Sequence, residues 1–307
     1  MARFNRTSSR STMKVIGGSS HPELTNLIAR KVGVRPCKIL LEKFANNETN
    51  VQLLDQVRCQ DVYIIQTGDT LPAFIISLMS THAGAVNSND AVMELLLIIN
   101  SCRLASAESI TVITPYFPYS KGDQKSSLRS PITAKLLANM IQKAGGHHLM
   151  MLDAHSPQLE GFFDHPVDCL KVEPLFCSWI THNIPDWRNC IVVSPDEGGA
   201  KRSVMLANDL GLEFAMIHNR HKKSLMQHSP QVSSRRTSQE EDDGTAEIIH
   251  VEEDLPDELR LTQRQVSEYL KISGDVAGMN CILVDDMIDT GSTVRLALEV
   301  LNTHNAG

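Results

Sequence analysis

The sequence lacks the features of several large classes of protein. Its 29 Lys and Arg are outnumbered by 36 Asp and Glu, and the formal net charge of -7 argues against non-specific binding of DNA or RNA. The seven cysteines are scattered, without a CxxC pair or a metal-ligand spacing. Scattered cysteines of this kind are typical of reduced thiols, so we expect a cytoplasmic protein that binds no nucleic acid.

Long apolar runs are also missing. Residues 1–12 contain Arg and Ser but no apolar core, so they are not a secretory signal, although a short mitochondrial transit peptide stays an alternative. The apolar run at 71–79 is far too short to span a bilayer. We therefore expect no membrane contact. The 307 residues suffice for one or two α/β domains with a substantial core.

Apolar runs of strand length alternate with amphipathic runs of helix length. The predicted strands lie at 14–16, 37–41, 62–66, 110–114, 149–152, 191–194, 214–217 and 281–284, and the predicted helices at 23–32, 93–100, 132–144, 203–210 and 294–301. This alternation, with polar residues directly after strands, predicts a doubly wound α/β fold with mostly parallel sheets. The pattern begins again near residue 190, which predicts two related domains.

Three acids and a turn of small residues follow the apolar run 281–284. They are Asp285, Asp286, Asp289, Thr290, Gly291, Ser292 and Thr293. The apolar run suits a strand buried on both faces of a parallel sheet. Backbone N–H groups at the turn, together with the positive end of the following helix dipole, would hold a phosphate. The acids would hold ribose hydroxyls or a Mg²⁺ shared with the phosphate.

Residues 224–270 interrupt the alternation. They are rich in Ser, Gln, Asp and Glu, have few large apolar residues, and include acidic runs at 240–243 and 252–254. This composition predicts a disordered or loosely ordered acidic insert. We expect residues 1–13 to be disordered as well.

Six strings occur in the order that is typical of one family. They are Phe44-Ala45-Asn46-Asn47-Glu48-Thr49, Met93-Glu94-Leu95-Leu96, Phe117-Pro118-Tyr119, Gly161-Phe162-Phe163-Asp164, Val193-Ser194-Pro195-Asp196 and the acidic stretch from Asp285. Together they resemble the ribose-phosphate pyrophosphokinases from about residue 14 to residue 301. Salvage phosphoribosyltransferases resemble only the last string, which disfavours them.

The resemblance implies two phosphoribosyltransferase-like domains, at 14–170 and 171–307, with 71–85 as an extra segment. Because the family continues well past the acidic stretch, we expect the C-terminal domain to be incomplete at residue 307. The implied reaction transfers the diphosphate of ATP to the C1 hydroxyl of ribose 5-phosphate, and AMP leaves. The product, phosphoribosyl pyrophosphate, is used in nucleotide biosynthesis. Family members also assemble into homo- or hetero-oligomers.

The resemblance also implies site residues. The matches are Phe44, Asn46 and Glu48 for adenine, His155 and Asp196 for a metal ion, and the seven residues of the acidic stretch named above for ribose 5-phosphate. Attack by a neutral hydroxyl on a highly charged phosphorus needs positioning and charge neutralisation, part of which Mg²⁺ supplies by bridging phosphate oxygens. Lys121 stands where the family has an Arg on the ATP phosphates, and it keeps the charge but loses the planar fork.

The basic loop that neutralises the transferring phosphates in the family is altered here. In the simplest alignment, Asn219 replaces its Lys and His221 replaces its Arg. The candidate catalytic cations are then Arg220, Lys222 and Lys223. Loss of a preorganised cation at a phosphoryl site costs on the order of 10³-fold or more in rate. A non-catalytic regulatory subunit, which binds nucleotide and modulates active partners, therefore stays an alternative to a working pyrophosphokinase.

Overall fold

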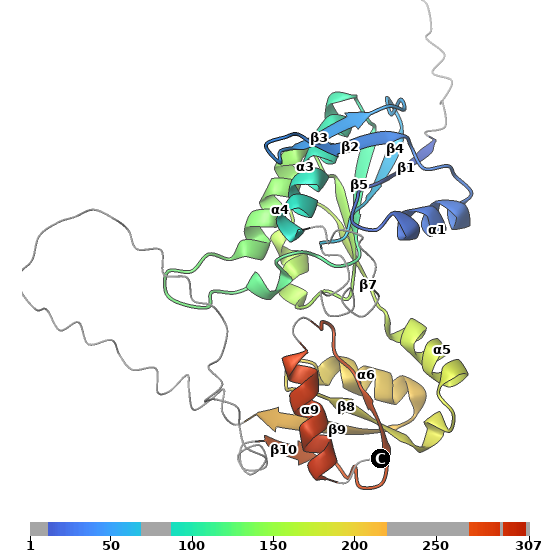
Figure 1. The fold of residues 1–307 in the computed structure, drawn as a ribbon, viewed down its shortest axis with the longest axis vertical. Helices are drawn as coiled ribbons and strands as arrows, with labels where there is room; N and C mark the ends of the chain where they lie inside the picture. The colour runs from blue at the N-terminus through green and yellow to red at the C-terminus, as the bar shows by residue number, and fades with distance from the viewer. Residues whose placement is uncertain (1–11, 69–86, 220–269, 289–290, 305–307) are drawn as a thin grey trace, which may run out of the picture. The chain divides into compact units, whose positions relative to one another are not determined.

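A computed structural model describes residues 12–68, 87–219, 270–288 and 291–304 (Figure 1). The chain divides into two compact units, Met1–Pro174 (unit 1) and Leu175–Gly307 (unit 2). Of residues 1–13, which were expected to be disordered, 1–11 lie outside the described residues, as does the extra segment 71–85. The expectation is wrong for Met13, which begins a strand that pairs with Asp61. The acidic insert also lies outside the described residues, except for its last residue, Leu270, which begins a strand.

The elements have the following bounds. Unit 1 contains β1 (Met13–Gly17), α1 (Pro22–Val32), β2 (Ile39–Lys43), β3 (Thr49–Leu53), β4 (Asp61–Ile65), α3 (Ser88–Leu104), β5 (Ser109–Thr114), η1 (Ser120–Gly122), α4 (Thr133–Ala144), β6 (His148–Leu152), η2 (Pro157–Phe162) and β7 (Val167–Leu170). Helix α5 (Glu173–Asn183) crosses into unit 2, which contains η3 (Trp187–Asn189), β8 (Cys190–Ser194), α6 (Ala200–Leu210), β9 (Glu213–Asn219), β10 (Leu270–Ser273), β11 (Asn280–Leu283) and α9 (Ser292–Thr303).

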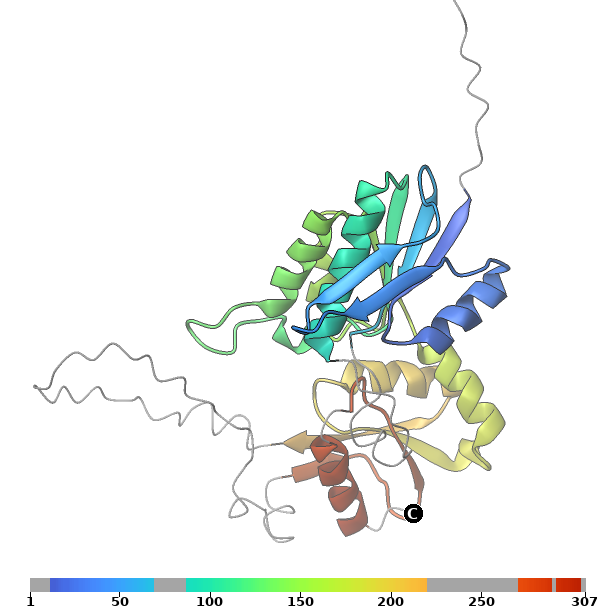
Figure 2. The same cartoon turned by 45° about the horizontal axis from the view of Figure 1, so that its top comes forward.

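Unit 1 is built on a parallel sheet with the strand order β1-β4-β5-β6-β7. Alternate residues of each strand point to opposite faces of the sheet, and apolar residues occupy both faces. Ile16, Ile64 and Val112 pack in the cluster formed with α3 and α4, whereas Val15 and Ile65 pack in the cluster formed with α1. Helices therefore cover both faces (Figure 2), as the doubly wound prediction requires.

A second, antiparallel sheet of two strands, β2 and β3, completes unit 1. Its apolar side chains Ile39, Leu41, Val51 and Leu53 pack against the same cluster as α3 and α4. The strands predicted from the sequence did not include Thr49–Leu53, which form β3. Cross-strand pairing with β2 stabilises this polar segment as a strand.

Unit 2 has a four-stranded sheet with the order β10-β9-β8-β11, in which β10 runs antiparallel to β9 and the other pairs are parallel. Ile191 and Val193 of β8 face the cluster that includes α9, and Val192 faces the cluster that includes α5 and α6. The fold is therefore α/β in both units, with mostly parallel sheets. None of the helices in the described ranges is long and apolar enough to cross a membrane.

Two expectations about unit 2 are corrected. The run Cys281–Leu283 was expected to be buried on both faces, but β11 is the last strand on its side of the sheet among the described strands, and these residues are half-buried. Helix α6 begins at Ala200, three residues before the predicted start, because the helix follows directly on the turn at Gly199. Apolar periodicity marks only the part of a helix that faces the core, so it misses polar first turns such as this one.

Candidate active site

The loop of the predicted adenine site, residues 44–48, is the tip of the β2–β3 hairpin. The Phe44 N–H donates to the Glu48 carbonyl at 2.9 Å, and the Asn47 N–H donates to the Phe44 carbonyl at 2.8 Å. Asn47 has a φ of 65°, a left-handed conformation that Asn tolerates better than most residues. The tight turn leaves the Phe44 side chain 53% exposed. An exposed aromatic face at a hairpin tip can stack on a planar base.

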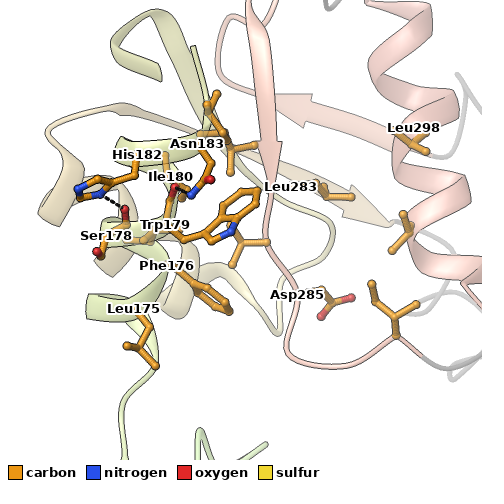
Figure 3. A pocket seen from close by; sticks show the side chains of 16 residues that line it. Leu175, Phe176, Ser178, Trp179, Ile180, His182, Asn183, Leu283, Asp285 and Leu298 are labelled. Carbon is orange, nitrogen blue, oxygen red and sulfur yellow. Dashed lines mark hydrogen bonds between the residues drawn. The ribbon is translucent and has the colours of Figure 1, made fainter. Parts of the chain in front are cut away.

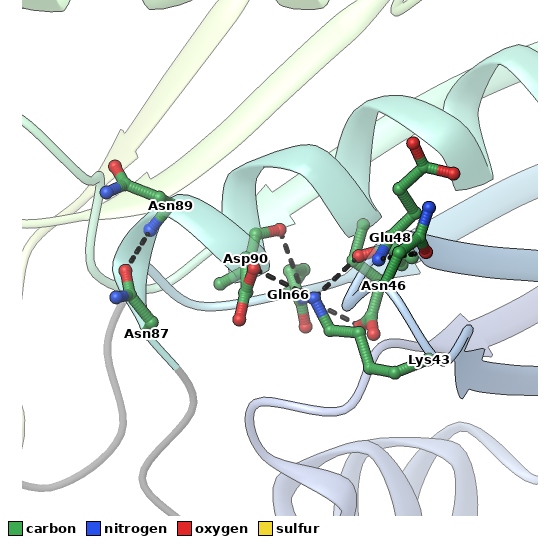
Figure 4. Close-up of polar contacts among 10 residues, drawn as sticks. Lys43, Asn46, Glu48, Gln66, Asn87, Asn89 and Asp90 are labelled. Carbon is green, nitrogen blue, oxygen red and sulfur yellow. Dashed lines mark hydrogen bonds and ion pairs between the residues drawn. The ribbon is translucent and has the colours of Figure 1, made fainter.

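The tip also carries two exposed polar side chains, Asn46 and Glu48, and a hydrogen bond orients the first of them. The Asn46 Oδ1 accepts a hydrogen bond from the Glu48 N–H at 3.2 Å, which orients the Asn46 amide (Figure 4). The Asn46 and Glu48 side chains are both exposed. The tip therefore offers a donor and two acceptors beside an aromatic ring, and these can bind the polar edge of a base.

Two more predicted residues of unit 1 lie in loops that follow parallel strands. Lys121 is exposed in η1, after β5, and Tyr119 sets the turn before it with a φ of 59°. His155 is exposed after β6, in a loop whose Asp153 N–H donates to the Leu170 carbonyl at 2.9 Å. Because the carboxyl ends of parallel strands meet at one edge of a sheet, both loops lie at the edge where binding sites form in such folds.

A buried polar network at this edge was missed by the sequence analysis. The Gln66 Oε1 accepts from the Ser20 hydroxyl at 2.6 Å, and the Gln66 Nε2 donates to the Glu94 Oε1 at 2.9 Å. The same Glu94 oxygen accepts from the Ser19 N–H at 2.7 Å. The network ties the ends of β1 and β4 to α3. The signal that marks it in the sequence is Glu94, a lone acid within an apolar helical run.

In unit 2 the structure brings three predicted acids together. Asp285 and Asp286 follow β11, and Asp196 follows the neighbouring strand β8. The Asp196 Oδ1 accepts from the Gly199 N–H at 2.9 Å and so fixes the turn before α6. The Asp286 carboxylate lies 3.5 Å from a guanidinium nitrogen of Arg202, and both side chains are largely buried. The sequence did not identify Arg202 as a site residue, because its contact with Asp286 is a tertiary one.

The pKa of Asp285 reflects the burial of its carboxyl group and the nearness of the other acids. It is raised from 3.8 to about 6, mainly by burial and also by the neighbouring carboxylates of Asp286 and Asp196, against a backbone hydrogen bond from Asp286 that lowers it. A carboxylate with a raised pKa binds a cation or a hydroxyl donor more favourably than a fully solvated one does, because it has already lost part of its hydration. The group can therefore accept hydrogen bonds from the hydroxyls of a sugar.

The turn after the acids begins α9. Gly291 has a φ of 74°, a left-handed conformation that favours glycine, and Ser292 and Thr293 form the first turn of the helix. The helix thus starts two residues before the predicted 294, again because its first turn is polar. Asp289 and Thr290 lie outside the described residues, as do the candidate catalytic cations Arg220, Lys222 and Lys223.

A metal site is not complete within the described residues. Over those ranges, no three His, Cys, Asp or Glu side chains are grouped so as to hold a metal ion by themselves. His155 belongs to unit 1 and Asp196 to unit 2. The Mg²⁺ that we expect from the sequence therefore stays a prediction.

Unit 2 also contains an apolar groove of about 1070 Å³ (Figure 3). It runs between α5, β11 and α9, with Phe176, Trp179, Leu283 and Leu298 among its lining residues and Asp285 at one side. A sugar phosphate needs polar partners for its hydroxyls and charges, so this apolar lining does not suit it. The groove is therefore distinct in chemistry from the group of acids.

Two protein-family profiles match the chain. One, described as the N-terminal domain of ribose phosphate pyrophosphokinase, matches residues 13–145, and the other, a phosphoribosyl transferase domain, matches residues 176–307. Among solved structures, the chain is similar to a phosphoribosylpyrophosphate synthetase from Mycobacterium smegmatis, at 29% sequence identity and a TM-score of 0.72. The match covers 96% of this chain and 78% of that one.

Proposed function

Because the chain belongs to the ribose-phosphate pyrophosphokinase family, we propose that it transfers the diphosphate of ATP to ribose 5-phosphate. In this reaction the C1 hydroxyl oxygen attacks the β-phosphorus of ATP. The bond from that phosphorus to the oxygen shared with the α-phosphate breaks, and AMP leaves. The products are phosphoribosyl pyrophosphate and AMP.

One observation carries the proposal: Asp285 and Asp286 lie near Asp196, and they precede the helix α9, which begins after Gly291 in its left-handed conformation. Carboxylates accept hydrogen bonds from the ribose hydroxyls, and the N-terminus of α9 attracts the 5-phosphate. A sugar phosphate carries hydroxyls and a phosphate at its two ends, so it matches this order of acids and helix start.

ATP binds, in this proposal, at the loops of unit 1. The Phe44 ring stacks on adenine, Asn46 and Glu48 contact its polar edge, and Lys121 binds the phosphates. Arg220, Lys222 and Lys223 neutralise the charge that develops on the transferring group, which is the main requirement for phosphoryl transfer. The family resemblance assigns His155 and Asp196 to Mg²⁺, for which the Asp196 carboxylate is the better donor because Mg²⁺ prefers oxygen ligands, and the bound ion would supply charge neutralisation at the phosphates.

A second candidate function is a regulatory subunit that binds ATP without turning over. It is favoured by Asn219, which ends β9 where the family has a Lys, and by His221 in place of an Arg. Both changes remove a fixed positive charge from the basic loop. Under either function we propose that the chain assembles with copies of itself or with other family subunits, and that it acts in the cytoplasm.

The two candidates are separated by measuring AMP release from the purified chain with ATP, ribose 5-phosphate and Mg²⁺. We expect AMP release. We expect Asp286→Ala to lower it by roughly 10²- to 10³-fold, because the carboxylate proposed to bind the ribose hydroxyls is lost. Binding of ATP is measured separately by calorimetry.

Asp209→Ala is the matched control. Asp209 is an exposed acid of unit 2 near the far end of α6, away from the group of acids, so its removal should leave AMP release unchanged. A folded chain that binds ATP and releases no AMP would remove the catalytic proposal and support the regulatory subunit. AMP release that Asp286→Ala leaves intact would contradict the role given to the acids.

A further inference from the structure

The loop that carries His155 leaves the sheet through a backbone turn of uncommon conformation. Asp153 follows directly on β6 and has a φ of 39°, in the left-handed region that residues other than glycine seldom adopt. A strained conformation of this kind persists only where neighbouring contacts hold it. Two of the contacts that hold it come from β7, the strand that pairs with β6.

Two consecutive N–H groups of the loop donate to residues of β7. The Asp153 N–H donates to the Leu170 carbonyl at 2.9 Å, next to the last paired residues of the two strands. The following N–H, that of Ala154, donates to the Cys169 Sγ at 3.2 Å. A thiol side chain thus serves as the acceptor at the point where the chain turns away from the sheet.

Cys169 reaches the loop because of the alternation of side chains along β7. Val167 and Cys169 are two residues apart, so they point to the same face of the sheet, and both pack against the cluster formed with α3 and α4. Ala154 packs against the same cluster, and all three residues are half-buried. The Ala154 N–H is therefore partly shielded from water, and removing its acceptor would leave a donor that water replaces poorly.

His155 is the next residue after this contact. Its side chain is exposed, and the direction in which it leaves the backbone follows from the dihedral angles of Asp153 and Ala154. On the other side of His155, η2 packs into the core through Leu159, which is fully buried. The loop is thus held on both sides of His155, and the Ala154 contact is the adjacent one in the chain.

We propose that Cys169 is a positioning residue, whose thiol fixes the Ala154 N–H and so directs the His155 imidazole toward ATP. The inference rests on the proposed place of His155 at the phosphates of ATP and their metal ion. Cys169 acts through the backbone and does not touch the nucleotide. Ribose 5-phosphate, which we assign to unit 2, should not sense a change at Cys169.

Hydrogen exchange at the Ala154 amide tests the contact in the chain without nucleotide or metal. Cys169→Val keeps an apolar side chain on β7 and removes the acceptor, so exchange at Ala154 should become about three- to tenfold faster. Cys169→Ser keeps an acceptor atom and should restore most of the protection. Exchange is measured by NMR, with the Leu149 amide as internal reference, because it donates to the Pro166 carbonyl at 3.1 Å and should be unaffected.

The functional consequence is a difference between the two substrates. Cys169→Val should weaken ATP binding about two- to fivefold, because His155 is then less well directed, and Cys169→Ser should bind ATP nearly as the wild type does. The affinity for ribose 5-phosphate should stay unchanged in both variants. Calorimetry in the presence of Mg²⁺ measures both affinities.

Val167→Ala is the matched control. It removes packing from the same strand and the same cluster, and it leaves the Cys169 acceptor in place. The variant should have a lower melting temperature than the wild type, with unchanged exchange at Ala154 and unchanged ATP binding. It therefore separates the loss of packing on β7 from the loss of the hydrogen bond.

Equal exchange at Ala154 in the wild type and in Cys169→Val would overturn the inference. So would faster exchange with unchanged ATP binding, or losses in Val167→Ala as large as those in Cys169→Val. Failure of the proposed reaction is distinguishable from these outcomes. A wild-type chain that binds ATP and releases no AMP removes the reaction, whereas exchange and calorimetry still decide the role of Cys169.

Discussion

The two units hold their polar loops in different ways. In unit 1, Gln66 and Glu94 form buried hydrogen bonds with Ser19 and Ser20, so the ends of β1 and β4 are held largely by paired polar groups. In unit 2, acids gather after β11 and its neighbour β8, and the ion pair that meets them comes from Arg202.

The difference shows where affinity for a ligand can arise. A satisfied network gains little from a further partner, whereas three neighbouring carboxylates, one of which pairs with Arg202, repel each other. The raised pKa of Asp285 comes mainly from burial and also from this repulsion. A cation or a hydroxyl donor would relieve the strain in unit 2, while unit 1 offers rigid support for exposed loops. Variants in each unit test this difference.

The largest effect on stability is expected in the buried network. Glu94→Ala removes the acceptor of the Ser19 N–H and of the Gln66 amide, and should destabilise the fold by about 2–4 kcal/mol. Glu94→Gln keeps an acceptor oxygen in place and should cost clearly less. Thermal and urea unfolding measure both. Equal stability of Glu94→Ala and the wild type would mean that the network does not support unit 1.

A smaller effect is expected at the acids of unit 2. Arg202→Met removes the guanidinium that lies 3.5 Å from Asp286, and should destabilise unit 2 by about 1–3 kcal/mol because the largely buried Asp286 then loses its cationic partner. Arg202→Lys keeps the charge and should recover part of the loss. If added Mg²⁺ restores the stability of Arg202→Met in calorimetry, the acids accept a divalent cation. No loss in Arg202→Met would contradict the comparison.

The pH dependence of stability should report Asp285. Its pKa is raised to about 6 in the folded chain, from an ordinary value of 3.8, so the folded chain holds a proton that the unfolded chain has already lost over this window. Stability from this group is therefore present below about pH 4 and decreases as the pH rises toward 6.

Asp285→Asn removes this titration. Relative to the wild type, the variant should gain about 1 kcal/mol between roughly pH 4.5 and pH 7, after allowance for solvent screening. Melting temperatures across this range measure the difference. A difference that stays constant with pH would show that Asp285 is not the titrating group.

The smallest effect is expected in the apolar groove of unit 2. Trp179 is 60% exposed on α5, so Trp179→Ala should change the free energy of unfolding by no more than about 0.5 kcal/mol. Ile180, its neighbour on the same helix, is buried against α6, and Ile180→Ala should cost about 2–4 kcal/mol. A large loss from Trp179→Ala would mean that the groove is a packed part of unit 2.

Prediction of strand and helix bounds from the sequence was most accurate where the pattern is local. The strand at 191–194 and the helix at 132–144 agree with β8 and α4 to within one residue, because buried apolar residues define them throughout. It failed at β3 and at the first turn of α6, where polar residues take a regular conformation only because a partner strand or a preceding turn stabilises it.

The candidate site divides in the same way. The acids Asp285 and Asp286 were identified from their place after an apolar run, and the structure sets Asp196 near them, as neighbouring parallel strands require. The contacts of Arg202 with Asp286 and of Gln66 with Glu94 were not predicted, because each joins segments separated by many residues. The assignment of these acids to ribose 5-phosphate stays a prediction that the Asp286→Ala assay tests.

The sequence by itself determined the alternation of strands and helices, and hence the fold class, since hydrophobic periodicity depends only on neighbouring residues. It also determined which side chains follow the ends of strands. Three properties depend on the tertiary fold: the place of β11 at the end of the described sheet, the ion pair of Lys43 with Asp90, and the burial that raises the pKa of Asp285. These properties depend on distance and solvent exclusion between residues far apart in the chain, which no local pattern encodes.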